Sequence, residues 1–175
     1  MRTPKCLFVS FLVVASVASA ADLTKEEKES ITKQLRSIAY AVEVGDADTP
    51  VRLMPDAIVE ASGGFDKLKE VTLVAYKLLQ TKGVKIETFE IGSDLDVYHG
   101  ENHDFLIVRE TIILKLQGKR VEIKSFVLGV RRKEGGDWRF VEGEKLTRAE
   151  IGKFFSDFPD VTLPETKRKI LDEKT

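Results

Sequence analysis

Cysteine is almost absent from this chain. The single cysteine, Cys6, lies within the first twenty residues, where two basic residues precede a short apolar run and the small residues Ala18-Ser19-Ala20. This pattern is typical of a secretory signal peptide over residues 1–20. We expect cleavage after Ala20 and export to the periplasm or the cell exterior. The exported chain would contain no cysteine, which excludes a disulfide, a thiol nucleophile and a thiolate metal site.

Long apolar runs and an excess of one charge are also missing. A membrane-spanning helix needs ~20 apolar residues, and no segment after residue 20 approaches that length. The 28 Lys and Arg residues nearly balance the 29 Asp and Glu residues, for a formal net charge of −1. A nucleic-acid-binding surface would show as a concentrated basic stripe. The composition therefore predicts no nucleic-acid partner and no membrane partner after cleavage. No cofactor is expected, since no motif in the sequence points to one.

Apolar residues recur at helical spacing in the first half of the exported chain. Thr24 and Glu27 form a capping-box pattern at the start of the first such segment. The predicted elements are a helix over 24–44, a short helix beginning at Thr49-Pro50, an extended segment over 57–61, and a helix over 65–82.

From residue 84 onward the periodicity changes from helical to alternating. The predicted strands cover 84–91, 104–117, 120–132 and 138–143, with an irregular polar connection over 92–102. Thr147 and Glu150 repeat the capping-box pattern before a short terminal helix. Helices followed by antiparallel strands predict an α+β fold with the helices on one face of the sheet. We expect one domain over residues 21–160 and a charged, disordered tail over 161–175.

The alternation sorts the strand side chains onto two faces. A two-residue turn at Gly118-Lys119 would place Lys115 opposite Glu122, a favourable pair of charges. The first face is nearly all apolar and is predicted to meet the helices. Its members are Leu106, Val108, Glu110, Ile112, Leu114, Leu116, Val121, Ile123, Ser125, Val127, Gly129, Trp138, Phe140 and Glu142.

The second face mixes apolar and charged residues. A monomer rarely exposes a wide apolar patch, so the apolar members of this face are candidates for a homodimer interface. They are Phe105, Ile107, Phe126, Leu128 and Val130. Alternatively, the terminal helix and the tail cover this face.

Glu110 and Glu142 are the charged exceptions on the first face. Burial of a carboxylate raises its pKa, so this pair is a candidate acid/base catalytic site. Two alternatives remain open. Arg131, Tyr40 or backbone donors could satisfy both carboxylates, or Glu142 could lie at the rim, in water.

The order of these elements, with Pro55-Asp56-Ala57-Ile58-Val59-Glu60 and the final strand Asp137–Gly143, resembles the nuclear transport factor 2-like superfamily, which includes SnoaL-like and ketosteroid-isomerase-like proteins. The resemblance implies a strongly bent, cone-shaped antiparallel sheet wrapped around the N-terminal helices, with a pocket inside and dimerisation through the sheet. It also implies that a catalytic Asp would follow Glu60, where this chain has Ala61. That departure argues against steroid isomerisation and favours a role other than catalysis.

The pocket implied by the resemblance would use few polar groups on an apolar wall, as ligand sites usually do. We expect it to be lined by Tyr40, Tyr76, Val108, Glu110, Ser125, Val127, Trp138 and Phe140. The leading hypothesis is an exported domain that binds a small molecule or a protein partner. The second is a lyase or isomerase in which Glu110 or Glu142 moves a proton, and the third is an interaction domain whose interior is filled.

His99 and His103 lie near Glu101 and Asp104, but no third metal ligand completes the group. Neither a metal site nor a hydrolase triad is predicted from them.

Overall fold

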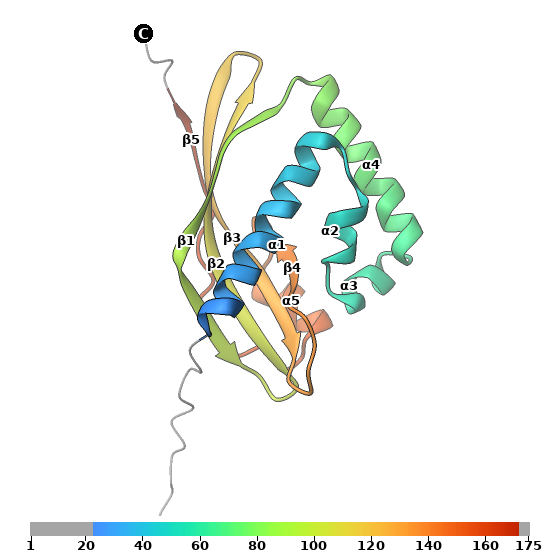
Figure 1. The fold of residues 1–175 in the computed structure, drawn as a ribbon, viewed down its shortest axis with the longest axis vertical. Coiled ribbons are helices and arrows are strands. Elements are labelled where there is room, and N and C mark those ends of the chain that lie inside the picture. The colour runs from blue at the N-terminus through green and yellow to red at the C-terminus, as the bar shows by residue number, and fades with distance from the viewer. Residues whose placement is uncertain (1–22, 172–175) are drawn as a thin grey trace, which may run out of the picture.

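The computed structural model describes residues 23–171, so the expected signal peptide lies outside the described residues. Four helices come first, and an antiparallel sheet that is not closed follows, with five strands in the described part of the chain (Figure 1). The fold is α+β. The elements are α1 Lys25–Val44, α2 Asp48–Arg52, α3 Asp56–Ala61, α4 Phe65–Thr81, β1 Lys85–His99, β2 His103–Leu116, β3 Lys119–Arg132, β4 Arg139–Glu142, α5 Arg148–Phe154 and β5 Lys167–Leu171.

The prediction of α1 is confirmed in both extent and capping. The Thr24 hydroxyl accepts a hydrogen bond from the Glu27 N–H at 3.1 Å, and the Glu27 carboxylate accepts one from the Thr24 N–H at 2.9 Å. Gly45 ends the helix in the left-handed region, at φ 74°, which costs glycine little because it has no Cβ. The helix lies across the sheet (Figure 1).

Two predictions in the next segment are wrong in detail. The second helix begins at Asp48 rather than Thr49, because the Asp46 carboxylate accepts hydrogen bonds from the Asp48 and Thr49 N–H groups at 2.9 and 3.4 Å. Residues 57–61, predicted to be extended, form α3 instead. The Pro55 carbonyl accepts hydrogen bonds from Ile58 and Val59. A short apolar run does not distinguish strand from helix by periodicity alone.

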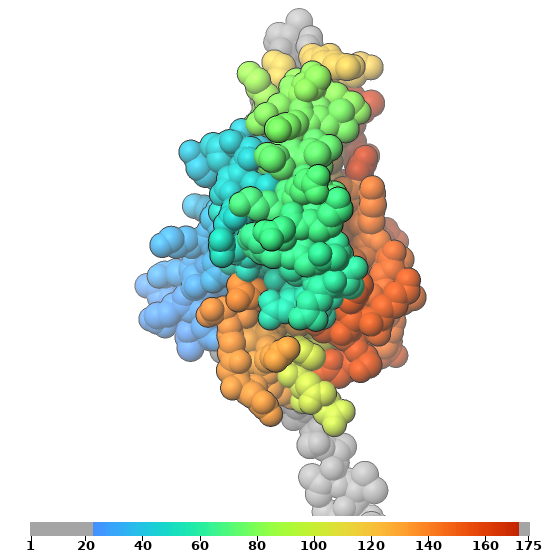
Figure 2. All heavy atoms as spheres, turned by 90° about the vertical axis from the view of Figure 1, so that its right-hand side faces the viewer, coloured from blue at the N-terminus to red at the C-terminus, as the bar shows by residue number. Residues whose placement is uncertain are grey.

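Helix α4 begins after two glycines with positive φ, Gly63 and Gly64, and it ends before Gly83, also at positive φ. Its predicted extent of 65–82 is confirmed within one residue. It packs mainly on α2 and α3 and stands farther from the sheet than α1 does (Figure 1). Figure 2 shows α4 as the outermost layer on its side of the molecule.

The sheet has the order β1-β2-β3, and both β4 and β5 pair with the far edge of β3. Strand β1 is longer than predicted, since it continues to His99 through part of the segment that was expected to be irregular. Its register shifts between Ile91 and Leu95. A bulge of this kind breaks the alternation that identifies a strand in sequence.

The turn between β2 and β3 lies one residue earlier than predicted, at Gln117 and Gly118, with φ of 51° and 82°. Two positive φ values are characteristic of a type I′ hairpin turn. Lys115 consequently lies opposite Arg120, and its predicted pairing with Glu122 is wrong. The register moves by two residues in total. Because side chains alternate with a period of two, every side chain keeps its predicted face.

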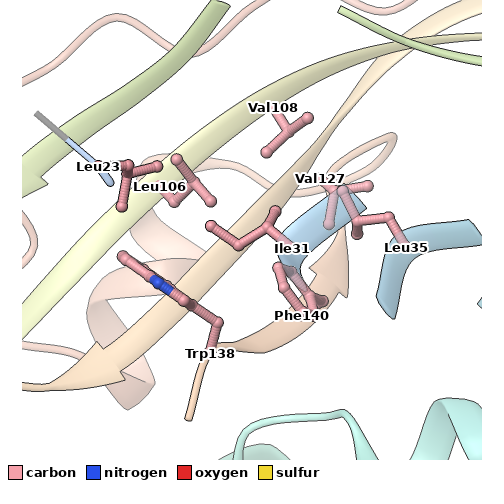
Figure 3. Close-up of a cluster of buried hydrophobic side chains, with 8 residues drawn as sticks. All are labelled: Leu23, Ile31, Leu35, Leu106, Val108, Val127, Trp138 and Phe140. Atoms are coloured by element: carbon pink, nitrogen blue, oxygen red, sulfur yellow. The ribbon is translucent and has the colours of Figure 1, made fainter. Parts of the chain in front are cut away.

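The predicted first face packs on α1, in a cluster that Figure 3 shows from close by. Ile31 and Leu35 of α1 meet the strand residues there. The buried members are Leu23, Ile31, Leu35, Leu106, Val108, Val127, Trp138 and Phe140.

The second face has its own core. The five side chains expected at a dimer interface are buried within one chain by α5 and the segment after it, so the alternative interpretation holds. Their cluster is Phe105, Ile107, Phe126, Leu128 and Val130 with Ile151, Phe155 and Phe158. A folded copy of the chain does not offer these five residues to a partner.

The segment expected as a disordered tail is ordered up to Leu171. Strand β5 pairs with β3 from Arg120 to Lys124. The Thr166 hydroxyl donates to the Glu144 carbonyl at 3.2 Å, and Arg168 forms an ion pair with the Glu144 carboxylate. Val161 and Leu163 pack on the second core. High charge density misled the prediction because these residues are ordered by backbone pairing and by packing of the preceding apolar residues.

Candidate functional site

Glu110 is the most unusual polar residue of the first face. It lies on β2 directly opposite Ser125 of β3 and is 6% exposed. The Ser125 hydroxyl donates a hydrogen bond of 2.7 Å to its carboxylate. Burial raises the pKa of Glu110, and the bond from Ser125 offsets this rise only in part. No ion pair with Glu110 forms within residues 23–171, so its charge has no direct cationic partner there.

Glu142 lies on β4 opposite Val127, on the same face as Glu110, and its side chain is exposed at the sheet edge. The surrounding protein still raises the pKa of Glu142, and the charge of Glu110 raises it further. Lys145 and Arg168 act in the opposite direction. Glu142 therefore lies at the rim, as one of the predicted alternatives proposed, but within electrostatic range of Glu110.

Tyr76 adds a hydroxyl to this region from α4. It is half-buried, and burial together with the charges of Asp46 and Glu142 raises its pKa to about 12. The phenol therefore stays protonated at neutral pH and can donate a hydrogen bond. Four of the predicted site residues thus share one region: the paired Glu110 and Ser125, with Glu142 and Tyr76.

The other predicted lining residues lie elsewhere. Val108, Val127, Trp138 and Phe140 are buried against α1, so packed side chains occupy that part of the predicted pocket (Figure 3). Tyr40 is 63% exposed and lies over β1 in a surface hollow that Glu43 and Ile86 also line. Only the end of the sheet nearest the β2–β3 turn is left unfilled by α1.

An apolar surface of α4 is left exposed at that end. No residue of α4, from Phe65 to Thr81, is buried. Val71, Val74, Leu78 and Leu79 are all exposed, Val74 at 62% and Leu78 at 53%. Helical spacing predicts that Val71, Leu78 and Leu79 share one side of this helix, but it does not show that the protein leaves that side exposed.

The matching wall of the sheet is also only partly covered. Ile112, Leu114, Leu116 and Val121 of the first face are intermediate in exposure, and Ile170 of β5, opposite Val121, is exposed. Leu79 of α4 lines a hollow of about 350 Å³ together with Val42, Val84 and Ile86. Ile86 in turn lies opposite Leu114. The hollow thus lies between Leu79 at the end of α4 and the edge of the first face.

A charged network at the opposite end of the sheet has a structural role. Asp104 binds the Nδ1 of His99 at 2.7 Å and Arg131 at 2.9 Å, and Arg131 also binds Glu27 of α1 at 2.7 Å. The Arg131 guanidinium lies 4.6 Å from the centre of the Trp138 ring. Arg131 therefore pairs with Asp104 and Glu27, and not with Glu110 or Glu142 as one alternative in the sequence analysis proposed. Within residues 23–171 no group of three or more His, Cys, Asp or Glu side chains could hold a metal ion.

Across residues 23–171, no helix combines the length and apolar character needed to cross a membrane. No protein-family model matches the chain. No curated protein matches it with significant similarity.

Proposed function

We propose that the chain is an exported domain of the nuclear transport factor 2-like type that binds a small, partly apolar molecule between α4 and the first face of the sheet. The order of helices and strands and the α1-covered first face support this assignment. In that family the sheet forms a cone around the helices, and the unfilled end described above would be the mouth of the cone.

One observation carries the proposal: the hollow between Leu79 of α4 and the first face is lined by apolar side chains that the protein leaves partly exposed. Each Å² of apolar surface left in water costs roughly 25 cal/mol. The nearby strand residues of the first face are incompletely covered as well. An apolar ligand in the hollow would cover Leu79 and Ile86 at once.

Polar groups of α4 and of the first face would orient the ligand. Tyr76 supplies a hydroxyl donor, and Glu110 and Glu142 supply acceptors, or donors when protonated. A few polar groups on an apolar wall are the usual composition of a small-molecule site.

Binding of a neutral, polarity-sensitive naphthalene dye such as prodan tests the proposal. We expect saturable binding with a blue-shifted emission. Leu79→Lys places a charge in the hollow that Leu79 lines and should weaken binding at least tenfold, without unfolding the protein because Leu79 is 36% exposed. Glu70→Lys, nine residues earlier and so on the opposite side of the same helix, is the matched control and should bind as the wild type does. Equal binding by the two variants would overturn the proposal.

Proton transfer is a second candidate function, favoured by the raised pKa values of Glu110 and Glu142. A raised pKa brings a carboxylic acid closer to the range that suits general acid/base work. Such a site would not use position 61, where Ala61 replaces the acid that the resemblance implies. Carbon-detected NMR titration of the two carboxyl groups tests this function, and ordinary pKa values for both would remove the reason for it.

A further inference from the structure

A separate groove lies on the second face of the sheet, away from the proposed ligand space. It has a volume of about 440 Å³ and lies between α3, the β3–β4 turn and α5. His103, Arg132, Arg139, Asp56, Asp137 and Phe154 are among the residues that line it. None of them takes part in the proposed function.

Asp157, which follows α5, fixes the ring of His103. One carboxylate oxygen accepts hydrogen bonds from the backbone N–H groups of Asn102 and His103 at 2.7 and 2.9 Å, and the other lies 3.0 Å from His103 Nδ1. Burial alone would raise the pKa of Asp157, but these hydrogen bonds outweigh it and hold the pKa below its usual range. An ionised carboxylate accepts but does not donate. We therefore assign the hydrogen of His103 to Nδ1.

The ring cannot easily turn away from this orientation. It packs on Phe155 and Phe105, with ring centres 5.3 and 6.0 Å apart. Within residues 23–171, His103 Nε2 has no hydrogen-bond partner, and the side chain is 23% exposed where it lines the groove. In the neutral ring Nε2 is then an acceptor held in a fixed direction.

Two guanidinium groups border the same groove. Arg132 lies directly opposite His103 across the β2–β3 pair, on the same face, and forms no ion pair with any residue of 23–171. Arg139 donates one hydrogen bond of 2.6 Å to the Arg52 carbonyl. Two carboxylates, Asp56 and Asp137, also line the groove and likewise form no ion pair in the described part of the chain. Phe154, 38% exposed, supplies an apolar wall.

We propose that this groove is a ligand site for a small hydroxy-carboxylate with an apolar substituent, in which Arg132 pairs with the carboxylate and His103 Nε2 accepts the hydroxyl hydrogen. Directly opposed residues in an antiparallel pair have Cβ atoms about 5 Å apart. Both side chains can therefore contact one small ligand in the groove. The apolar substituent would lie on Phe154. Asp157 would orient His103 for the hydroxyl of the ligand. The Arg132 guanidinium would pair with the carboxylate of the ligand.

Mandelate, with phenylacetate and benzyl alcohol as matched probes, tests the site. Phenylacetate lacks the hydroxyl and benzyl alcohol lacks the carboxylate, so each should bind at least fivefold more weakly than mandelate. Arg132→Gln should weaken mandelate binding at least fivefold, and the neighbouring surface variant Lys133→Gln should not. Both positions are exposed, so neither change threatens folding.

Nitrogen NMR of the imidazole rings distinguishes a ligand-binding histidine from a purely structural one. The ring nitrogen shifts of a purely structural histidine should not change when mandelate is added. The chain has two histidines, so their ring signals are readily assigned. We expect the Nε2 signal of His103 to shift on addition of mandelate, while the signals of His99 are unchanged. Absence of that shift, or equal mandelate binding by wild type and Arg132→Gln, would overturn the proposal. Leu79→Lys should leave mandelate binding intact, so a failure of this site is distinguishable from a failure of the proposed function.

Discussion

Helices α1 and α4 are both long and amphipathic, yet the protein uses them differently. Helix α1 buries Ile31, Leu35 and Ala41, whereas α4 buries none of its residues from Phe65 to Thr81. The end of the sheet under α1 is filled, and the end near the β2–β3 turn is partly open. An apolar stripe therefore predicts that a helix forms, but it does not say whether the protein itself covers the stripe.

Core truncation should give the largest difference between the two helices. Leu35→Ala removes a side chain that is 2% exposed in the cluster under α1 and should lower the free energy of unfolding by about 2–5 kcal/mol. Leu78→Ala on α4 should change it by no more than ~0.5 kcal/mol. Urea unfolding of both variants measures the contrast. Equal losses would mean that α4 is packed as tightly as α1.

The next largest effect concerns Glu110, on the first face, and the pH dependence of the free energy of unfolding. Its folded-state pKa is raised above the ordinary value of 4.5, so its contribution to stability is fully present below about pH 4.5 and is lost as the pH rises through the folded pKa. Glu110→Gln should remove that loss and stabilise the protein at pH 7 by on the order of 1 kcal/mol for each unit of pKa difference.

Unfolding free energies measured from pH 4 to 8 test this expectation. Glu134→Gln, in the exposed β3–β4 turn, is the control and should keep the wild-type pH dependence. If Glu110→Gln also followed the wild-type curve, the carboxylate would be better solvated than its burial indicates.

Helix capping sharpens the comparison further, because α1 has a capping box while Gly64 provides no side-chain cap for α4. Thr24→Ala should cost about 1 kcal/mol. The Thr24 side chain is exposed, so the loss would come from the N–H of Glu27 and not from the core. Amide hydrogen exchange should show faster opening in the first turn of α1 only. Unchanged exchange there would contradict the proposed role of the cap.

The smallest effect concerns strand register near the open end. Lys115 lies between Lys85 and Arg120 across the sheet, so Lys115→Glu should stabilise the protein by roughly 0.2–1 kcal/mol. With the pairing expected from the sequence, the new Glu would oppose Glu122 and destabilise it instead. The sign of the change in thermal unfolding therefore distinguishes the two registers.

The sequence analysis succeeded where a signal was local. Capping boxes at Thr24 and Thr147 were predicted and are present, and alternation placed Leu114, Ile123 and Phe140 on one face. It failed where distant residues decide the outcome. The bulge in β1 is set by its pairing with β2, and the ordering of β5 depends on an edge of β3 that β4 leaves free.

The residues of the candidate site show the same contrast between local signals and distant contacts. Glu110 stood out as a charge on an apolar face, and its pairing with Ser125 needed only a shift of register. Tyr40 and Tyr76 looked equivalent in sequence, but Tyr40 is exposed over β1, whereas Tyr76 is half-buried within electrostatic range of Asp46 and Glu142. His103 carried no usable signal, because the residue that orients it, Asp157, is 54 positions away.

The sequence by itself determined which segments form helices and strands and which strand side chains share a face, because those properties depend on spacing along a single chain segment. Tertiary structure alone decided that α1 covers one end of the first face, that α5 covers the second face, and that the apolar side of α4 remains exposed. These outcomes depend on which surfaces meet in space, and no local periodicity records that.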